Sequence, residues 1–161
     1  MSRLRFLSPD ECASEVELAS PLAAIGQAIT DVSSLGKLEV HGDVAGIETA
    51  AGEELLPLDP SRVLLVCDGP TRAARERLAG AGYRVYDLTA GLAAFEVEGE
   101  DVLRRLTALD LDALPTTGSV GRGISALIER RSGSTFRLFV PRELGQSLAE
   151  ITADIVEGLG R

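Results

Sequence analysis

A strand, a glycine corner and a short amphipathic helix can be read in residues 86–114, and this unit constrains the fold more than any other part of the chain. Phe95 and Val97 alternate with Glu96 and Glu98, which is the period of two expected of a strand with one buried face. Gly99 then interrupts the strand. A helix is expected from residue 100 to the acidic step 110–112, because four apolar residues share one helical face: Val102, Leu103, Leu106 and Leu109.

The same layout occurs earlier in the chain. Residues 39–44 (EVHGDV) match residues 96–102 (EVEGEDV), which contain one additional acidic residue. In the same order, residues 62–66 (RVLLV), Gly69-Pro70 and a helix match residues 136–140 (FRLFV), Pro141 and a helix. Two matches in one order predict an internal duplication. We therefore expect a single domain over residues 20–161, built from two pseudo-repeats at about 37–91 and 92–160.

Composition and charge exclude several classes of protein. With 161 residues and 45% hydrophobic content, the chain can bury a core of its own. Its formal net charge of −9 argues against nucleic acids and anionic membranes as partners, because phosphate groups attract clustered Lys and Arg. Cys12 and Cys67 form neither a metal-ligand spacing nor a disulfide framework. A reducing cytoplasm is therefore expected. No apolar run approaches the roughly 20 residues that span a bilayer, so we expect a soluble protein.

The remaining elements are expected from apolar periodicity and from glycine and proline positions. In the first half we expect an arm (1–19) that is loose or docked on a partner, a short helix from Ser20 that ends near Thr30-Asp31, a strand (38–41), a helix (43–51), a proline-punctuated connection (53–60) and a central strand (62–67). In the second half we expect a helix (71–79), a strand (83–88), a loop (115–123), a hairpin (124–130 and 135–140) and a closing helix (142–159). This order predicts an α+β domain with a mainly antiparallel sheet, and a doubly wound α/β sheet is the alternative.

Candidate sites are few. His41 is the only histidine, and the chain contains no nucleophile elbow that would complete a triad with it. Residues 116–123 (TTGSVGRG) contain no lysine and lead into a strand, so they are expected to be a flexible connector and not a phosphate-binding loop. Asp110 and Asp112 could act as a base or as hydrogen-bond acceptors. Turn formation through their own backbone is the favoured interpretation.

Several short motifs together resemble a known family. They are, in order, SPLA (20–23), LEVHG (38–42), LP (56–57), YDLTAG (86–91), FEVEG (95–99), Asp110-Leu111 and STFRLFVPR (134–142). Their sequence and order are similar to those of the gamma subunit of heterotetrameric sarcosine oxidase, over residues 20–158. This family is related to the folate-binding domain of the glycine cleavage T-protein, an aminomethyltransferase. The resemblance implies a folate-binding-domain fold.

The resemblance also implies where a site could lie. In the T-protein family an aspartate near the folate occupies the position that Asp110 resembles, so Asp110 is the weak candidate for catalysis and for cofactor binding. The chain departs from the T-protein because it lacks the loop with paired aspartates, the C-terminal domain and a Tyr or Arg cluster for the pterin and glutamate tail. It departs from the gamma pattern at residues 68–72, where an acidic residue and a Trp are usual.

The function implied by this resemblance is that of a non-catalytic accessory subunit in a sarcosine-oxidase-like, folate-linked amine-oxidising complex of one-carbon metabolism. Its partner would be a larger flavoprotein subunit, and the activity of the complex would be sarcosine oxidation or aminomethyl transfer to tetrahydrofolate. We expect no metal and no tightly bound cofactor, although tetrahydrofolate is possible. Two alternatives stay open: a stand-alone folate-binding aminomethyltransferase-like protein, and a self-associating scaffold.

Overall fold

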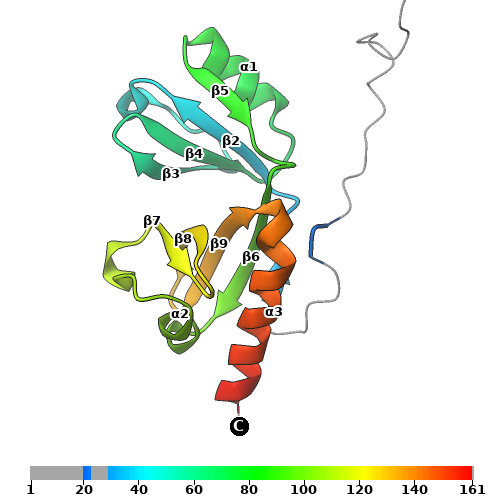
Figure 1. The fold of residues 1–161 in the computed structure, drawn as a ribbon. Coiled ribbons are helices and arrows are strands. Elements are labelled where there is room, and N and C mark those ends of the chain that lie inside the picture. The colour runs from blue at the N-terminus through cyan, green and yellow to red at the C-terminus, as the bar shows by residue number, and fades with distance from the viewer. Residues whose placement is uncertain (1–19, 23–28, 161) are drawn as a thin grey trace, which may run out of the picture.

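Two antiparallel sheets and three α-helices make up the computed structural model, which describes residues 20–22 and 29–160 (Figure 1). The small sheet has the strand order β3-β4-β2-β5, and the large sheet has the order β1-β6-β9-β8-β7. The elements, in chain order, are β1 (Ile29–Asp31), β2 (Gly36–His41), η2 (Val44–Gly46), β3 (Glu53–Asp59), β4 (Arg62–Cys67), α1 (Arg72–Gly80), β5 (Arg84–Asp87), β6 (Leu92–Glu98), α2 (Glu100–Leu106), η3 (Leu111–Ala113), β7 (Thr116–Val120), β8 (Ile124–Ser132), β9 (Thr135–Pro141) and α3 (Arg142–Leu159).

The layers follow the order helix, sheet, sheet, helix. Helix α1 covers the outer face of the small sheet, and α2 and α3 cover the outer face of the large sheet (Figure 1). The inner faces of the two sheets pack on each other through Leu56, Leu64, Val66, Ala94, Leu127 and Phe139. The fold is therefore α+β with antiparallel sheets, as the sequence predicts. The doubly wound alternative is wrong, because the described strands pair antiparallel throughout.

Strand β4 shows why its sequence is almost continuously apolar. Leu64 and Val66 face the large sheet, whereas Val63 and Leu65 face α1. Because both faces are buried, the alternation typical of a half-exposed strand is absent. The prediction of a central strand is confirmed, since β4 lies between β3 and β2.

The two sheets share a strand order. In the small sheet, β4 lies between β2 and β3. In the large sheet, β9 lies between β6 and β8 in the same way, so β2, β4 and β3 correspond to β6, β9 and β8. In register, Glu39 lies opposite Leu64, and Glu96 lies opposite Arg137. If Glu39 and Glu96 are equivalent, strand pairing makes Leu64 equivalent to Arg137. The sequence match had aligned Leu64 with Leu138, so that alignment is wrong by one residue. The duplication itself stays a prediction that this common order supports.

Two expectations for residues 43–60 are wrong. The expected helix over 43–51 is only the 3₁₀ turn η2, where Asp43 makes no side-chain capping hydrogen bond and the chain leaves at Ile47 in extended conformation. The expected connection over 53–60 is the strand β3. Pro57 is tolerated there because β3 is an edge strand, on which a missing N–H breaks no ladder.

The segment after β6 also differs in part from expectation. Gly99 makes the expected corner with φ 105°, and α2 begins at Glu100. Helix α2 ends at Leu106 and not at the acidic step, because Thr107 is extended and its hydroxyl donates to the Ser119 carbonyl (2.8 Å). The loop expected over 115–123 is wrong, since residues 116–120 form β7 and pair with β8. The hairpin between β8 and β9, and α3, are confirmed.

The N-terminal expectations are only partly tested. The arm (1–19) and residues 23–28 lie outside the described residues. Residues 29–31 are strand β1, paired with β6, so the expected helix does not end near Thr30-Asp31. None of the helices in the described ranges is long and apolar enough to cross a membrane.

Candidate functional site

Five charged side chains from four strands meet between the two sheets, and we name them the inter-sheet charge cluster: Glu54 (β3), Glu96 (β6), Glu129 and Arg131 (β8), and Arg137 (β9). Strand alternation places them there, because residues 127, 129 and 131 of β8 face the small sheet, as do residues 137 and 139 of β9. Glu129 is 2% exposed and Arg137 is 4% exposed. Such deep burial of charge is uncommon unless the charges are paired.

Arg137 is the centre of the cluster. Its Nε donates to Glu96 Oε1 (3.1 Å) and lies 3.1 Å from Glu129 Oε1. Arg131 donates to Glu54, and Arg137 Nη2 lies 3.8 Å from the same Glu54 carboxylate. Glu54 belongs to the small sheet and both arginines to the large one, so these ion pairs connect the two sheets.

Glu129 carries the strongest electrostatic perturbation in the cluster. Burial raises the pKa of Glu129 from 4.5 to about 7, against the opposing influence of Arg137. Glu54 raises the pKa of Glu129 further, and Arg131 lowers it. Among the described residues, Glu129 Oε1 has no hydrogen-bond partner. The Glu129 carboxyl can therefore exchange a proton near neutral pH.

A cavity of about 340 Å³ adjoins the cluster. Its walls include Gly52, Glu54, Asp68, Arg131 and Arg137. The guanidinium groups that reach it are already paired with carboxylates of the cluster. A ligand would have to displace these ion pairs, so the arrangement is better suited to holding the sheets together than to binding a substrate.

Lys37, the only lysine in the chain, is fully buried where β2 begins. Its Nζ donates to the carbonyls of Ser33 (2.8 Å) and Leu35 (2.7 Å). Burial lowers the pKa of Lys37 to about 8, while Asp87 and Asp31 act in the opposite direction. Its Nζ also donates to the Thr89 carbonyl (3.4 Å). With 0% exposure and three carbonyl acceptors, Lys37 has a structural role: it holds the turn before β2 against the segment that follows β5.

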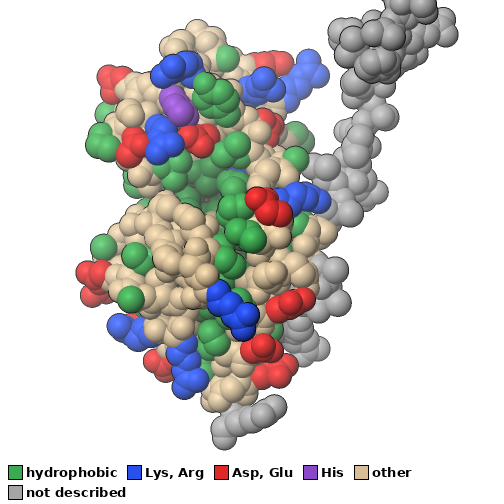
Figure 2. Space-filling view, viewed as in Figure 1, with side chains coloured by type: hydrophobic (Ala, Val, Ile, Leu, Met, Phe, Trp, Pro, Cys, Tyr) green, Lys and Arg blue, Asp and Glu red, His purple; other side chains and the backbone are tan. Residues whose placement is uncertain are grey.

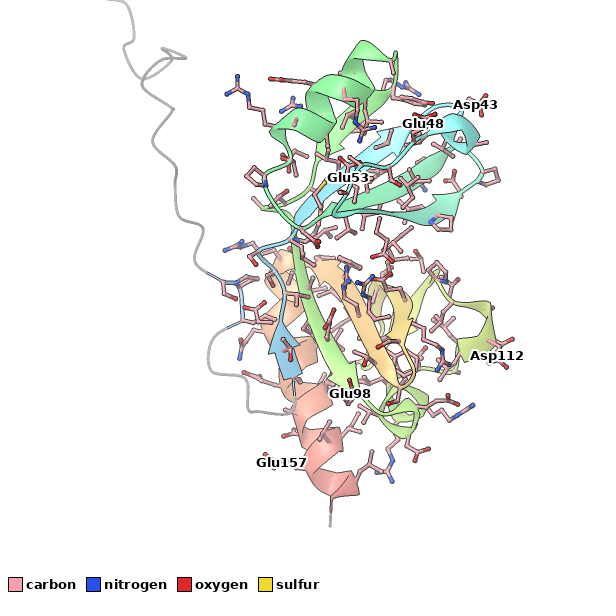
Figure 3. All side chains as sticks on the ribbon, turned by 180° about the vertical axis from the view of Figure 1, so that it is seen from behind. Asp43, Glu48, Glu53, Glu98, Asp112 and Glu157 are labelled. Carbon is pink, nitrogen blue, oxygen red and sulfur yellow. The ribbon has the colours of Figure 1, made fainter. Side chains whose placement is uncertain are left out.

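The residues singled out in the sequence do not meet in one place. Asp110 is exposed at the start of η3, and its Oδ1 accepts from the Asp112 N–H (3.0 Å), which is the local turn contact expected of this pair. Asp112 lies at the outer edge of the half of the molecule that holds the large sheet (Figure 3). His41 lies on the small sheet with its Nε2 2.7 Å from Glu39 Oε1. A role for Asp110 toward a ligand stays a prediction.

Cys67 and the acidic residues that the structure describes offer no metal site. Within residues 20–22 and 29–160, no three His, Cys, Asp or Glu side chains are grouped so that they could hold a metal ion. Cys67 is a buried free thiol on β4, and burial raises the pKa of Cys67. A buried thiol with a raised pKa is a poor nucleophile.

Sequence reasoning missed the inter-sheet charge cluster and the buried Lys37. The run Glu129-Arg130-Arg131 is typical of the solvent-exposed end of a strand. Glu129 is buried only because the small sheet packs over this end of β8. The one available signal was compositional, because a single lysine occurs in a chain whose other basic residues are all arginine.

The sequence matches no protein-family model and no curated protein. Solved structures do match the fold. A chain of the heterotetrameric sarcosine oxidase from Corynebacterium sp. U-96, in complex with pyrrole 2-carboxylate, has a TM-score of 0.72 and 19% identity. The similarity covers 88% of this chain and 90% of that chain. The glycine cleavage system aminomethyltransferase T from Bartonella henselae has a TM-score of 0.53 and 15% identity, and the similarity covers 77% of this chain and 44% of that one.

These matches confirm the relationship in fold that the sequence motifs predict. Nearly the whole of this chain superposes on nearly the whole of one sarcosine oxidase chain, and on less than half of the aminomethyltransferase. The chain therefore has the fold found in a chain of heterotetrameric sarcosine oxidase and in part of aminomethyltransferase T.

Proposed function

We propose that this chain is a non-catalytic accessory subunit of a sarcosine-oxidase-like, folate-linked amine-oxidising complex, with a larger flavoprotein as its partner. The observation that carries the proposal is that the similarity covers most of both chains: 88% of this chain superposes on 90% of a chain from a heterotetramer. A match over most of both chains is what two subunits of the same kind would give.

The chemistry of the described residues supports an accessory role. The buried charges of the inter-sheet charge cluster are paired with one another, and its most perturbed group, Glu129, is only 2% exposed. Asp110 is engaged in a turn. These observations support a chain that contributes a folded surface to the complex.

The proposal is tested by purifying the affinity-tagged full chain from its source organism. We expect a larger polypeptide to co-purify in a fixed stoichiometry, with flavin absorbance and with amine-dependent oxygen consumption. A tagged chain that is recovered alone at 16.9 kDa, in extracts that retain amine oxidase activity, would refute the proposal.

A folate-binding protein is the second candidate, favoured by the similarity to aminomethyltransferase T. Calorimetric titration of the isolated chain with tetrahydrofolate separates the two. Micromolar binding that Asp110→Ala abolishes would support this candidate over the accessory role. Light scattering on the same sample tests the third possibility, since a stable dimer without any partner would indicate a self-associating scaffold.

A further inference from the structure

We propose that the seam between the two sheets contains a docking pocket that takes one apolar side chain of the larger subunit, with a basic group of that subunit beside Glu39. This inference rests on the proposed function, and it locates the contact between the two polypeptides. The pocket lies at the edge of the inter-sheet layer that is formed by β3, β4, β2 and the residue after β5 on one side, and by β6, β8 and β9 on the other.

The pocket has the size and lining of an anchor site. Its volume is about 220 Å³, below the roughly 300–1,000 Å³ typical of pockets for drug-sized ligands. Apolar side chains from both sheets form most of its wall: Leu58, Leu64, Leu88, Leu92, Leu127 and Phe139. Figure 2 shows hydrophobic side chains gathered along the seam between the two sheets. An apolar side chain fits this space better than a cofactor does.

An exposed aromatic residue adjoins the pocket. Tyr86, on the edge strand β5, is 51% exposed, and its ring makes an edge-on contact with His41 at 5.1 Å between centroids. Tyr86 lies opposite Glu39 in register, and both share a face with Leu88 because strand residues alternate. Tyrosines with one apolar face are enriched where proteins associate. The pocket and Tyr86 therefore form one continuous surface.

The charge at the pocket indicates what kind of segment would bind. Glu39 is the one charged residue in the wall among the described residues. Its Oε1 accepts from Arg62 Nη1 (3.2 Å), and Arg62 is shared with Asp59 (Nε to Oδ2, 2.6 Å). Two carboxylates and one guanidinium leave one net negative charge beside the pocket. The whole chain carries a formal charge of −9. A partner segment with an apolar anchor next to Lys or Arg complements both features.

Lysine substitutions at the surface test the pocket. Leu58→Lys places a charge in the wall and Tyr86→Lys places one beside it, and both residues are partly or largely exposed. Leu159→Lys is the matched control, because Leu159 is 37% exposed at the end of α3. The flavin-bearing subunit recovered with the wild-type chain is purified and titrated with each variant by calorimetry. Circular dichroism melting curves establish that each variant is folded.

We expect at least tenfold weaker binding of Leu58→Lys and Tyr86→Lys, with Leu159→Lys and the conservative Leu58→Met unchanged. If the wild type binds the flavoprotein and the pocket variants bind equally well, the docking pocket is refuted while the proposed function stands. If the wild type recovers no flavoprotein, both fail. The wild-type chain could instead have twice the mass of 16.9 kDa in solution, and the pocket variants the mass of a single chain. This result would assign the pocket to a second copy of this chain and would also overturn the inference.

Discussion

Replacing Glu129 by glutamine should change how the stability of the protein depends on pH. Burial raises the pKa of Glu129 from 4.5 to about 7, so the folded chain keeps a proton that the unfolded chain has already released in this interval. Because the folded state binds more protons there, the free energy of unfolding falls as the pH rises from 4.5 through 7. Stability from this group is present at low pH and is lost above pH 7.

The size of the effect follows from the same interval. At about 1.4 kcal/mol per pKa unit, a rise from 4.5 to about 7 corresponds to a loss on the order of 3 kcal/mol between pH 4.5 and pH 8. Glutamine has nearly the shape of the protonated carboxyl and does not titrate. Glu129→Gln should therefore match the wild type near pH 5 and exceed its stability at pH 8, by an amount of this order.

Urea unfolding at pH 5 and pH 8, followed by circular dichroism, measures the difference directly. Other carboxylates titrate in both proteins, so the comparison between variant and wild type isolates Glu129. Glu157→Gln, at an exposed position near the end of α3, is the matched control and should keep the wild-type pH dependence (Figure 3). Identical pH profiles for Glu129→Gln and the wild type would refute the assignment of a raised pKa to this residue.

Three further substitutions test individual packing contacts. Lys37→Met removes the donor to three buried or partly buried carbonyls and should lower the free energy of unfolding by about 1–3 kcal/mol in denaturant titrations; an unchanged value would contradict the structural role of Lys37. Gly145→Ala would place a Cβ 2.5 Å from the Ala93 Cβ and should lower the free energy of unfolding by about 1–3 kcal/mol. Gly158→Ala in the same helix meets nothing within 4 Å and should be neutral or slightly stabilising. Equal melting temperatures of the two variants would show that α3 does not approach β6 this closely. Asp110→Ala removes one exposed turn contact and should change stability by less than about 1 kcal/mol, and a larger loss on thermal melting would indicate contacts beyond the turn.

The predictable parts of the fold are those whose sequence pattern is set by two buried faces or by strong turn residues. Strand β4 was predictable because Leu64 and Leu65 face opposite apolar layers, and Gly99 marked the end of β6 because its φ of 105° favours glycine. Helix α3 has a long apolar stripe with period 3.6. In each case local sequence and tertiary packing point to the same structure.

The edge strands β3 and β7 were not predictable. Pro57 in β3 and Gly118 in β7 are residues that disfavour strands, and Pro57 is accommodated because β3 is an edge strand. At Gly118 the side chain of Leu109 fills the space that a Cβ would take, so glycine is needed at this position. Both strands depend on contacts with other segments of the chain, which local sequence patterns do not reveal.

The site was less predictable than the fold. Asp110 and Asp112 were identified as turn residues, and their contact confirms this interpretation. The inter-sheet charge cluster was missed, because the burial of Glu129 and Arg137 depends on the small sheet that covers them. A charged residue on a strand reads as solvent-facing until the second sheet is known.

The most direct test of the account is the mass and flavin content of the complex that contains this chain, measured by native mass spectrometry on material from its source organism. The account predicts that the 16.9 kDa chain is found in a fixed ratio with a larger flavin-bearing chain. Recovery of the chain only as free monomer or as a homo-oligomer, while the flavin-bearing amine oxidase of the same extract is intact without it, would contradict the account.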